Sequence, residues 1–322
     1  MKRARRILVW TLASLLSLVV IIYLGAVGFM TMRESELVYP GAYRTGGVGL
    51  AVQDSTGASW DTLRVAADDG VRVFLLDNRL PAGSHTPWIL YFHGNGGHVG
   101  SREAIRRYRI FHELGFDVLA VEYRGYGESR GTKPSEAGVY ADARAGWKYL
   151  TGTLRVDPGR IVIYGWSLGS GVATNLAAEV RPAGLITEGT FTSLPAVGHS
   201  LYPWLPTRLI MRNRFDNLSK ANRVQAPWLL LHGRHDQEVP FQEAEHLASA
   251  GAAHARLVPL DAGHDVLLGD RSGAEAALRT FADSVLGVPA PGSGAGGADV
   301  TPGATSDSTA RSGGPTPAAS RR

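Results

Sequence analysis

The chain has no cysteine among its 322 residues. This absence excludes disulfide bonds, thiolate nucleophiles and cysteine-ligated zinc or iron–sulfur centres. Charged side chains are scarce as well: they make up 19% of the chain, and the formal net charge is +4. Four basic residues lie within the first six positions, so the rest of the chain is nearly neutral and offers no basic surface to a nucleic acid. We expect no nucleic-acid partner, no cofactor and no metal ion.

A second absence concerns the N-terminal segment, which has no charged residue from Ile7 to Met30. At about 1.5 Å per residue, a helix of this length can cross a hydrocarbon core of about 30 Å. The run is apolar on every face, which a helix of a soluble domain rarely is. We therefore predict an anchor over residues 1–30. The alternative is a cleaved signal peptide, whose best cleavage site would be Ala26–Gly28.

The basic cluster before this segment predicts its orientation. By the positive-inside rule the N-terminus stays in the cytoplasm and the rest of the chain is translocated. We expect a single-pass membrane protein whose main body lies on the extracytoplasmic side, in the periplasm or outside the cell if the source is bacterial.

The remaining chain divides by composition. Residues 31–60 are rich in glycine and serine and are predicted to be a tether and lead-in. Residues 287–322 have no aromatic side chain and consist largely of Gly, Ala, Pro, Ser and Thr. Such a segment cannot bury enough apolar surface to offset its ordering entropy, so we predict disorder there. Residues 61–286 are left for one folded domain.

Within 61–286, apolar runs of strand length alternate with helical patterns. Two runs flank a hairpin signal at Asp69 and Gly70. The later strands are predicted at Trp88–Phe92, Val118–Val121, Ile161–Tyr164, Leu185–Thr187, Trp228–Leu231 and Arg256–Leu260. An antiparallel start followed by strand–helix alternation predicts an α/β fold with a mostly parallel sheet and helices on both faces. Ligands of such sheets bind beyond the carboxyl ends of the strands.

The pentapeptide Gly-Trp-Ser-Leu-Gly at 165–169 matches the G-x-S-x-G pattern of a nucleophile elbow. A predicted strand runs into it and a predicted helix follows, which is the context this motif needs. The serine sits on a strained turn, so glycines are required two residues to either side. A glycine-rich helix entry is the plainer interpretation of the pentapeptide alone. With strand and helix in place, we predict that Ser167 is the nucleophile.

A serine hydroxyl needs a base, and the base needs an orienting acid. Both should follow the nucleophile, each at the end of a later strand. Asp236 lies just past the strand Trp228–Leu231, and His264 lies just past Arg256–Leu260. We predict Ser167, Asp236 and His264 as a catalytic triad.

Other side chains compete for these two roles. Glu238, Asp261 and Asp265 are alternatives for the acid. His232 and His235 are alternatives for the base, but they precede the acid and would break the expected order.

An oxyanion hole requires backbone N–H groups aimed at the developing charge. Leu168, directly after the nucleophile, would supply one. The loop 93–97 (His-Gly-Asn-Gly-Gly) would supply the other, from Asn95 or, as a second choice, Gly96. A plain strand-to-helix turn and a phosphate-binding loop are the alternatives, but the Lys-Ser/Thr ending of a P-loop is missing. His93 is predicted to have a structural, hydrogen-bonded role.

Between about 192 and 226 the alternation breaks into an apolar, proline-containing insertion. It falls between the nucleophile half and the acid strand, so it should lie over the active site. A helix packed on the core is the plainer interpretation. We favour a small cap that lines an acyl-binding site.

Four segments together resemble a known family: residues 91–97 (YFHGNGG), 122–129 (EYRGYGES), 165–171 (GWSLGSG) and 214–218 (RFDNL). They look like the Bem46-like α/β-hydrolases, a group that includes α/β-hydrolase domain-containing protein 13 and is typically anchored by one N-terminal helix. The resemblance covers about 60–286 and the anchor. It implies the α/β-hydrolase fold and the triad Ser167, Asp236 and His264. It implies no particular substrate, although relatives include protein depalmitoylases.

The sequence thus predicts a membrane-anchored serine hydrolase that cleaves an ester or thioester of an apolar acyl group, such as a lipid-like small molecule. One alternative is a non-catalytic, membrane-tethered binding module on the same scaffold. Another is a serine peptidase, which usually carries a larger accessory domain. Dehalogenase chemistry would require an aspartate at the position of Ser167.

Overall fold

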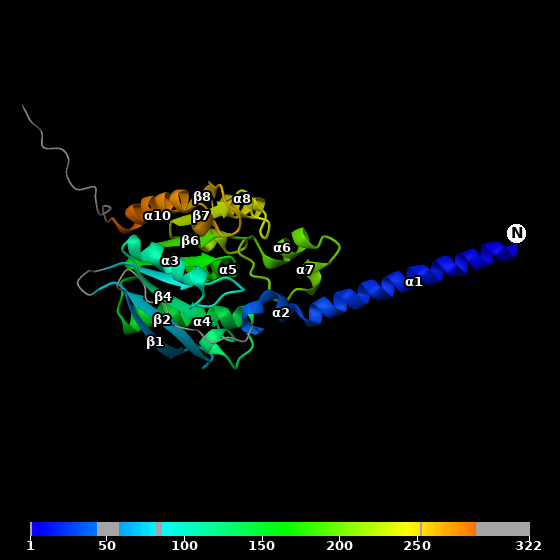
Figure 1. Ribbon diagram of the computed structural model, residues 1–322, viewed down its shortest axis with the longest axis horizontal. Helices are drawn as coiled ribbons and strands as arrows, with labels where there is room; N and C mark the ends of the chain where they lie inside the picture. Colours follow the sequence, from blue (N-terminus) through cyan, green and yellow to red (C-terminus); the bar gives the residue numbers. More distant parts are fainter. Residues whose placement is uncertain (1, 44–57, 82–85, 252, 288–322) are drawn as a thin grey trace, which may run out of the picture. The chain divides into compact units, whose positions relative to one another are not determined.

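The computed structural model describes residues 2–43, 58–81, 86–251 and 253–287 (Figure 1). The described chain contains an eight-stranded sheet. Its strands are β1 (Ser59–Ala66), β2 (Arg72–Arg79), β3 (Trp88–Phe92), β4 (Asp117–Glu122), β5 (Ile161–Trp166), β6 (Gly184–Glu188), β7 (Trp228–Gly233) and β8 (Ala255–Leu260). The disorder predicted for 287–322 falls, apart from Gly287, outside the described residues.

The strands lie in the order β1-β2-β4-β3-β5-β6-β7-β8. The pairs β1–β2 and β2–β4 are antiparallel, and all later pairs are parallel. Phe92 at the end of β3 pairs with Val121 of β4 and with Gly165 of β5. The loops that follow these strands therefore leave from the same edge of the sheet. This architecture confirms the predicted α/β-hydrolase fold.

Helices cover both faces of the sheet, as predicted (Figure 1). One face packs against α4, α5 and α8, and the other packs against α3, α9 and α10. These helices are α3 (Arg102–Glu113), α4 (Glu136–Lys148), α5 (Leu168–Ala177), α8 (Phe241–Ala250), α9 (Val266–Gly269) and α10 (Arg271–Leu286). The insertion after β6 forms two further helices, α6 (Leu194–Leu201) and α7 (Thr207–Ile210).

Local sequence signals explain where these helices begin and end. The Ser101 side chain accepts a hydrogen bond from the Ala104 N–H at the start of α3, and Ser135 caps α4 in the same way. Both side chains satisfy N–H groups that have no partner within the helix. Gly115, with φ of 85°, follows α3 in the left-handed conformation that glycine adopts without strain.

The N-terminal segment begins with α1 (Lys2–Met32), which is long and apolar enough to cross a membrane. It is followed by α2 (Glu34–Val38) and a 3-10 turn (Pro40–Tyr43). The sequence predicts a tether at residues 34–43, yet several of them pack against the folded body. Tyr39 is fully buried, and its hydroxyl donates a hydrogen bond to Oδ1 of Asn213 at 2.8 Å.

Candidate active site

Ser167 lies on the sharp turn between β5 and α5, with φ of 52° and ψ of −121°. This backbone conformation is strained for a residue with a side chain. The turn also forces close backbone contacts. A Cβ atom on Gly165 would lie 2.1 Å from the carbonyl oxygen of Gly169, and one on Gly169 would lie 2.2 Å from that of Phe92. The two glycines are therefore required by the elbow that holds Ser167.

His264 and Asp236 meet beyond the ends of the neighbouring strands β7 and β8. His264 Nδ1 lies 2.7 Å from Asp236 Oδ2. The other carboxylate oxygen, Oδ1, accepts hydrogen bonds from the N–H groups of Glu238 and Val239, both at 2.9 Å. Asp236 is therefore held in place by backbone donors while it orients the imidazole ring of His264.

The surroundings shift the pKa of both groups. Burial alone would raise the pKa of Asp236, but hydrogen bonds from His232 and His264 outweigh it and leave the pKa well below its usual range. Burial alone would lower the pKa of His264, but the hydrogen bond and charge of Asp236 raise it above its usual value. The pair therefore favours an ionised aspartate and stabilises an imidazolium.

Of the alternative acids, two form ion pairs with other residues and the third is exposed to solvent. Asp261 pairs with His235 at 2.9 Å on the exposed surface. Asp265 pairs with a buried arginine at 2.5 Å. Glu238 is exposed, and its nearest carboxylate oxygen lies 3.9 Å from His264 Nε2.

His232 is fully buried, and its Nε2 donates to the Val239 carbonyl at 3.0 Å. The same Nε2 lies 3.2 Å from Asp236 Oδ2. Two histidines thus flank one carboxylate, but only His264 stands at the end of β8, beside the elbow.

His264 faces the elbow. Its ring centroid lies 6.1 Å from that of Trp166, the residue before Ser167. A Cβ on Gly189 would lie 2.9 Å from the His264 ring, so glycine is needed there for the ring to fit. Among the residues that the structure describes, Nε2 of His264 is buried and has no hydrogen-bond partner. In ligand-free hydrolases, the catalytic bond between serine and histidine is often long and tightens only with substrate.

The loop after β3 approaches the elbow closely. A Cβ on Gly94 would lie 3.5 Å from the Cβ of Ser167. His93 Nδ1 donates to the Gly94 carbonyl at 2.8 Å, and its Nε2 lies 3.1 Å from Glu122 Oε1. This confirms the structural role predicted for His93. The ring fixes the Gly94–Asn95 peptide and therefore the direction of the Asn95 N–H.

The Asn95 carbonyl is fixed as well. It accepts hydrogen bonds from the Gly41 N–H at 3.0 Å and from the Tyr126 hydroxyl at 2.9 Å. Leu168 is the first residue of α5, so its N–H has no acceptor within the helix. Asn95 and Leu168 line the same cavity as Ser167. The two residues predicted as oxyanion donors therefore lie on the wall of one cavity with Ser167.

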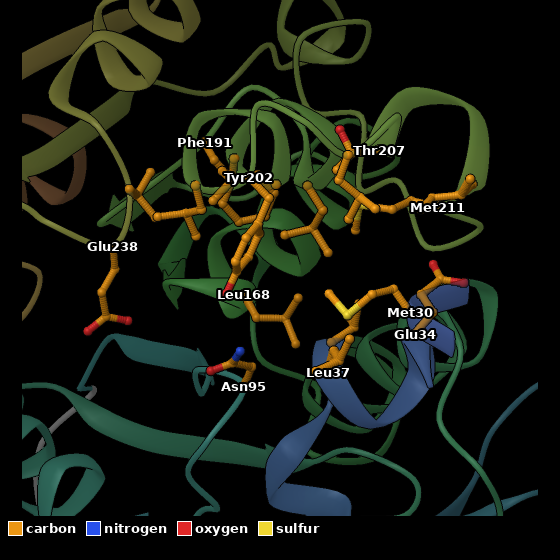
Figure 2. A pocket seen from close by; sticks show the side chains of 18 of the residues that line it. Met30, Glu34, Leu37, Asn95, Leu168, Phe191, Tyr202, Thr207, Met211 and Glu238 are labelled. Atoms are coloured by element: carbon orange, nitrogen blue, oxygen red, sulfur yellow. The ribbon is translucent and has the colours of Figure 1, made fainter. Parts of the chain in front are cut away.

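That cavity has a volume of about 340 Å³ and mostly apolar walls. In Figure 2, Met30 and Leu37 lie on one side of it, Phe191 and Tyr202 on the other, and Leu168 between them. The insertion supplies much of the wall, as the cap prediction requires. The N-terminal segment supplies a further part of it, through Met30, Thr31, Glu34, Leu37 and Val38. Sequence analysis missed this contribution, because nothing in the pattern of 30–38 distinguishes a cavity wall from a tether.

A buried ionic network behind the elbow was also missed. Arg107 of α3 is fully buried and pairs with Glu188, at the end of β6, at 2.9 Å. Glu188 also accepts hydrogen bonds from the Tyr164 hydroxyl and the Leu267 N–H. No sequence motif predicts the ion pair between Arg107 and Glu188. Within the described ranges, no group of three His, Asp or Glu side chains is arranged to hold a metal ion.

Comparison with known proteins identifies relatives that cover from about half to three quarters of this chain. The profile of the family described as "Prolyl oligopeptidase family" matches residues 104–283. An uncharacterized protein of Mycobacterium tuberculosis is 34% identical over 242 residues, which cover 75% of this chain and 84% of that protein. Protein bem46 of Schizosaccharomyces pombe is 32% identical over 230 residues, covering 67% of this chain and 74% of bem46.

A third relative is the lysophosphatidylserine lipase ABHD12 of Danio rerio, 35% identical over 187 residues. The match covers 52% of this chain and 48% of the lipase, so it spans about half of that protein. Among solved structures, the esterase Pf2001 of Pyrococcus furiosus superposes with a TM-score of 0.61 at 20% identity. The superposition covers 72% of this chain and 94% of the esterase, and at this identity it shows a shared fold.

These matches agree with the fold and confirm the resemblance drawn from the four sequence segments. The chain belongs to the prolyl oligopeptidase family of α/β-hydrolases and is related to Bem46 and ABHD12.

Proposed function

We propose that this protein is a membrane-anchored serine hydrolase that cleaves an ester or thioester of an apolar acyl group. One observation carries the proposal. Ser167 lines an apolar cavity from a strained elbow, and His264, oriented by Asp236, packs beside that elbow. This is the arrangement that converts a weakly nucleophilic hydroxyl into an acyl acceptor.

The proposed reaction passes through an acyl-serine intermediate. His264 Nε2 removes the proton from Ser167 Oγ while Oγ attacks the acyl carbonyl carbon. The N–H groups of Leu168 and Asn95 stabilise the tetrahedral oxyanion. The intermediate collapses, and His264 gives its proton to the departing alcohol or thiol. Water, deprotonated by His264, then attacks the acyl-serine and releases the acid.

The cavity supports an apolar acyl group as the substrate class. Its walls consist mainly of aliphatic and aromatic side chains, many of them from the insertion, from α2 and from the end of α1. Such walls favour a hydrocarbon chain over a sugar or a polar peptide. A relative named for lysophosphatidylserine hydrolysis supports a lipid-like ester.

The anchoring part of the proposal depends on α1. Its length and apolar composition allow a membrane span, and the basic residues before it favour a cytoplasmic N-terminus by the positive-inside rule. Cleavage as a signal peptide at Ala26–Gly28 would leave Met30 and Thr31 on the cavity wall but would remove Tyr23, whose hydroxyl donates a hydrogen bond to the Trp204 carbonyl. Protease protection of the intact chain in membranes tests this orientation. Degradation of the catalytic body from the cytoplasmic side would contradict it.

Hydrolysis of chromogenic esters from acetyl to palmitoyl tests the activity. We expect Ser167→Ala to abolish turnover of every ester. Ser170→Ala is the matched control: this serine is buried three residues away, and its hydroxyl has no hydrogen-bond partner among the described residues. It should therefore keep full activity. Equal rates for wild type and Ser167→Ala would rule out ester hydrolysis at this site.

A serine peptidase is the second candidate, because the matching family profile is that of prolyl oligopeptidases. Aminoacyl and peptidyl anilides, assayed beside the esters, separate the two. Turnover of anilides without turnover of esters would favour the peptidase. Turnover of neither would favour a binding module.

A further inference from the structure

The insertion carries an exposed apolar surface where a soluble domain would be polar. Leu201 is 47% exposed, Tyr202 45%, Trp204 54% and Leu209 87%. All four lie within nine residues, at the end of α6, in the turn that follows and in α7. We call these four residues the cap tip. A cluster of large apolar side chains facing outward marks a surface that another apolar body covers.

The cap tip lies against α1. The Tyr23 hydroxyl donates a hydrogen bond to the Trp204 carbonyl at 3.2 Å. The two aromatic rings also meet edge to face, with 6.4 Å between their centroids. The turn of the cap therefore touches the apolar helix well inside its uncharged run.

A second contact fixes the cap relative to the end of this helix. Glu34 is buried, and its Oε1 accepts hydrogen bonds from the backbone N–H groups of Arg212 and Asn213, at 2.7 and 2.8 Å. The side-chain amide of Asn213 adds a third, at 3.2 Å. The cap thus contacts the N-terminal segment at two places, through Trp204 at Tyr23 and through residues 212–213 at Glu34. These contacts fix the position of the cap relative to α1.

The depth of the cap tip can be estimated along the helix. The uncharged run starts at Ile7, and Tyr23 comes 16 residues later. At 1.5 Å per residue this is about 24 Å, within a hydrocarbon core of about 30 Å. Met30 lies about 35 Å from Ile7, just beyond the core. If α1 spans the bilayer, Trp204 stands at the outer boundary of the hydrocarbon, and the cavity wall at Met30 stands at the level of the headgroups.

We propose that the cap tip inserts into the membrane leaflet beside α1, and that the cavity receives its lipid substrate sideways from this leaflet. The inference rests on the proposed anchoring and lipid hydrolysis. Leu201 and Tyr202 support it doubly, because they are exposed on the cap tip and also line the cavity. The rim of the cavity is therefore part of the surface that would contact lipid.

The residue types fit a bilayer surface. Trp204 and Tyr202 are the side chains that membrane interfaces favour, with an apolar ring and a polar tip. Arg208 and Arg212 are exposed beside the cap tip, where their guanidinium groups can reach lipid phosphates. Because the cap tip contacts α1, a bilayer that surrounds α1 would also cover the cap tip, and this favours lipid over a second protein as the body that covers it.

Site-specific labelling tests the contact directly, because the chain has no native cysteine. The full chain carrying Leu209→Cys is labelled with an environment-sensitive fluorophore and reconstituted into vesicles of phosphatidylcholine and phosphatidylglycerol. Leu218→Cys is the control: this leucine is also exposed, at 46%, but lies past the cap helices. We expect spin-labelled lipids to quench the label at position 209 several-fold more than that at 218, and aqueous iodide to show the reverse.

Two labelling results would overturn the proposal, whatever the enzymatic activity. Equal iodide quenching at both positions would mean that the cap tip faces water. Protection of position 209 from both quenchers would mean that a second copy of the chain covers it.

A rate comparison tests the lateral entry of substrate. Leu209 does not line the cavity, so Leu209→Ser should leave hydrolysis of a short, water-soluble ester unchanged. Hydrolysis of a long-chain lipid ester within the vesicles should fall about tenfold, since one large apolar contact with the bilayer is lost. Equal rates on both substrates for wild type and variant would contradict lateral entry. Loss of all ester turnover in the wild type would instead contradict the proposed function and leave the labelling result standing.

Discussion

The guanidinium of Arg107 stacks on the indole ring of Trp166, with 4.1 Å between its Cζ and the ring centroid. Trp166 directly precedes Ser167. The same guanidinium pairs with Asp265, which directly follows His264, at 2.5 Å. One buried arginine thus joins the neighbours of the proposed nucleophile and of the proposed base. Its attachment to Glu188 fixes it to the sheet.

Replacing this arginine should destabilise the fold. Arg107→Met leaves the carboxylate of Glu188 buried without its partner, which typically costs about 3–5 kcal/mol. We expect a marked fall in the thermal unfolding midpoint. Arg106→Met, a change to the exposed neighbour on the same helix, should have little effect. Similar midpoints for the two variants would mean that the buried network does not stabilise the elbow.

The proposed base predicts the acid limb of the pH–rate profile. The Asp236 hydrogen bond holds the pKa of His264 above its ordinary value of 6.5 despite burial. His264 can accept the serine proton only when it is neutral, so activity is lost as pH falls through this pKa. We expect kcat/KM of the wild type to rise with pH through a midpoint above 6.5. A midpoint near 4 would assign the limb to a carboxylate instead.

Asp236→Asn should shift this limb and slow the reaction. Without the carboxylate, burial dominates and the pKa of His264 falls, so the acid limb moves to lower pH. The amide also favours the wrong imidazole tautomer, and such a change costs about 10⁴ in kcat in a serine protease. Asp261→Asn is the matched control, since Asp261 pairs with His235 on the exposed surface. If Asp261→Asn lost most of its kcat and Asp236→Asn lost none, Asp261 rather than Asp236 would be the acid that orients His264.

Substitution of Gly41 in the N-terminal segment should displace the loop 93–97, which carries the proposed oxyanion donor Asn95. A Cβ on Gly41 would lie 2.6 Å from a ring carbon of Tyr126 and 3.0 Å from the Asn95 carbonyl oxygen. Gly41→Ala therefore displaces the loop that carries the Asn95 N–H. We expect kcat to fall by up to about a hundredfold, the scale of losing one oxyanion donor. Gly152→Ala, where a new Cβ meets nothing within 4 Å, should leave kcat unchanged.

The predictable parts of this protein are those in which neighbouring residues determine the structure. The strand Trp88–Phe92 matches its predicted bounds, because its apolar pattern and the glycine-rich loop after it specify it locally. The elbow at Ser167 follows from a strand, two glycines and a helix within a few residues. The meeting of Asp236 and His264 could be anticipated because their loops follow adjacent parallel strands.

Contacts between distant segments could not be predicted in this way. Arg107 and Glu188 are 81 residues apart, and neither residue type is expected in a core. Residues 34–43 are predicted to be part of a tether because the segment 31–60 as a whole is rich in glycine and serine. Their burial depends on acceptors and donors near 212–213, whose position only the fold reveals.

The attachment of Glu34 to the cap gives the sharpest test of whether the N-terminal segment belongs to the active site. Glu34→Ala leaves the N–H groups of Arg212 and Asn213 without their acceptor, at about 1–3 kcal/mol for each donor that stays buried. We expect a lower unfolding midpoint together with a changed preference for acyl chain length, because the wall formed by Met30 and Leu37 loses its support.

Glu36→Ala is the matched control for this prediction. Glu36 is two residues away and pairs with Arg33 at the surface, where an ion pair contributes little. The control should keep both the unfolding midpoint and the chain-length optimum of the wild type. If Glu34→Ala behaved like the control in both measurements, the end of α1 would be a passive tether. If it shifted both, the anchor and the acyl site would form one structural unit, because a single carboxylate holds the helix end against the cap that lines the cavity.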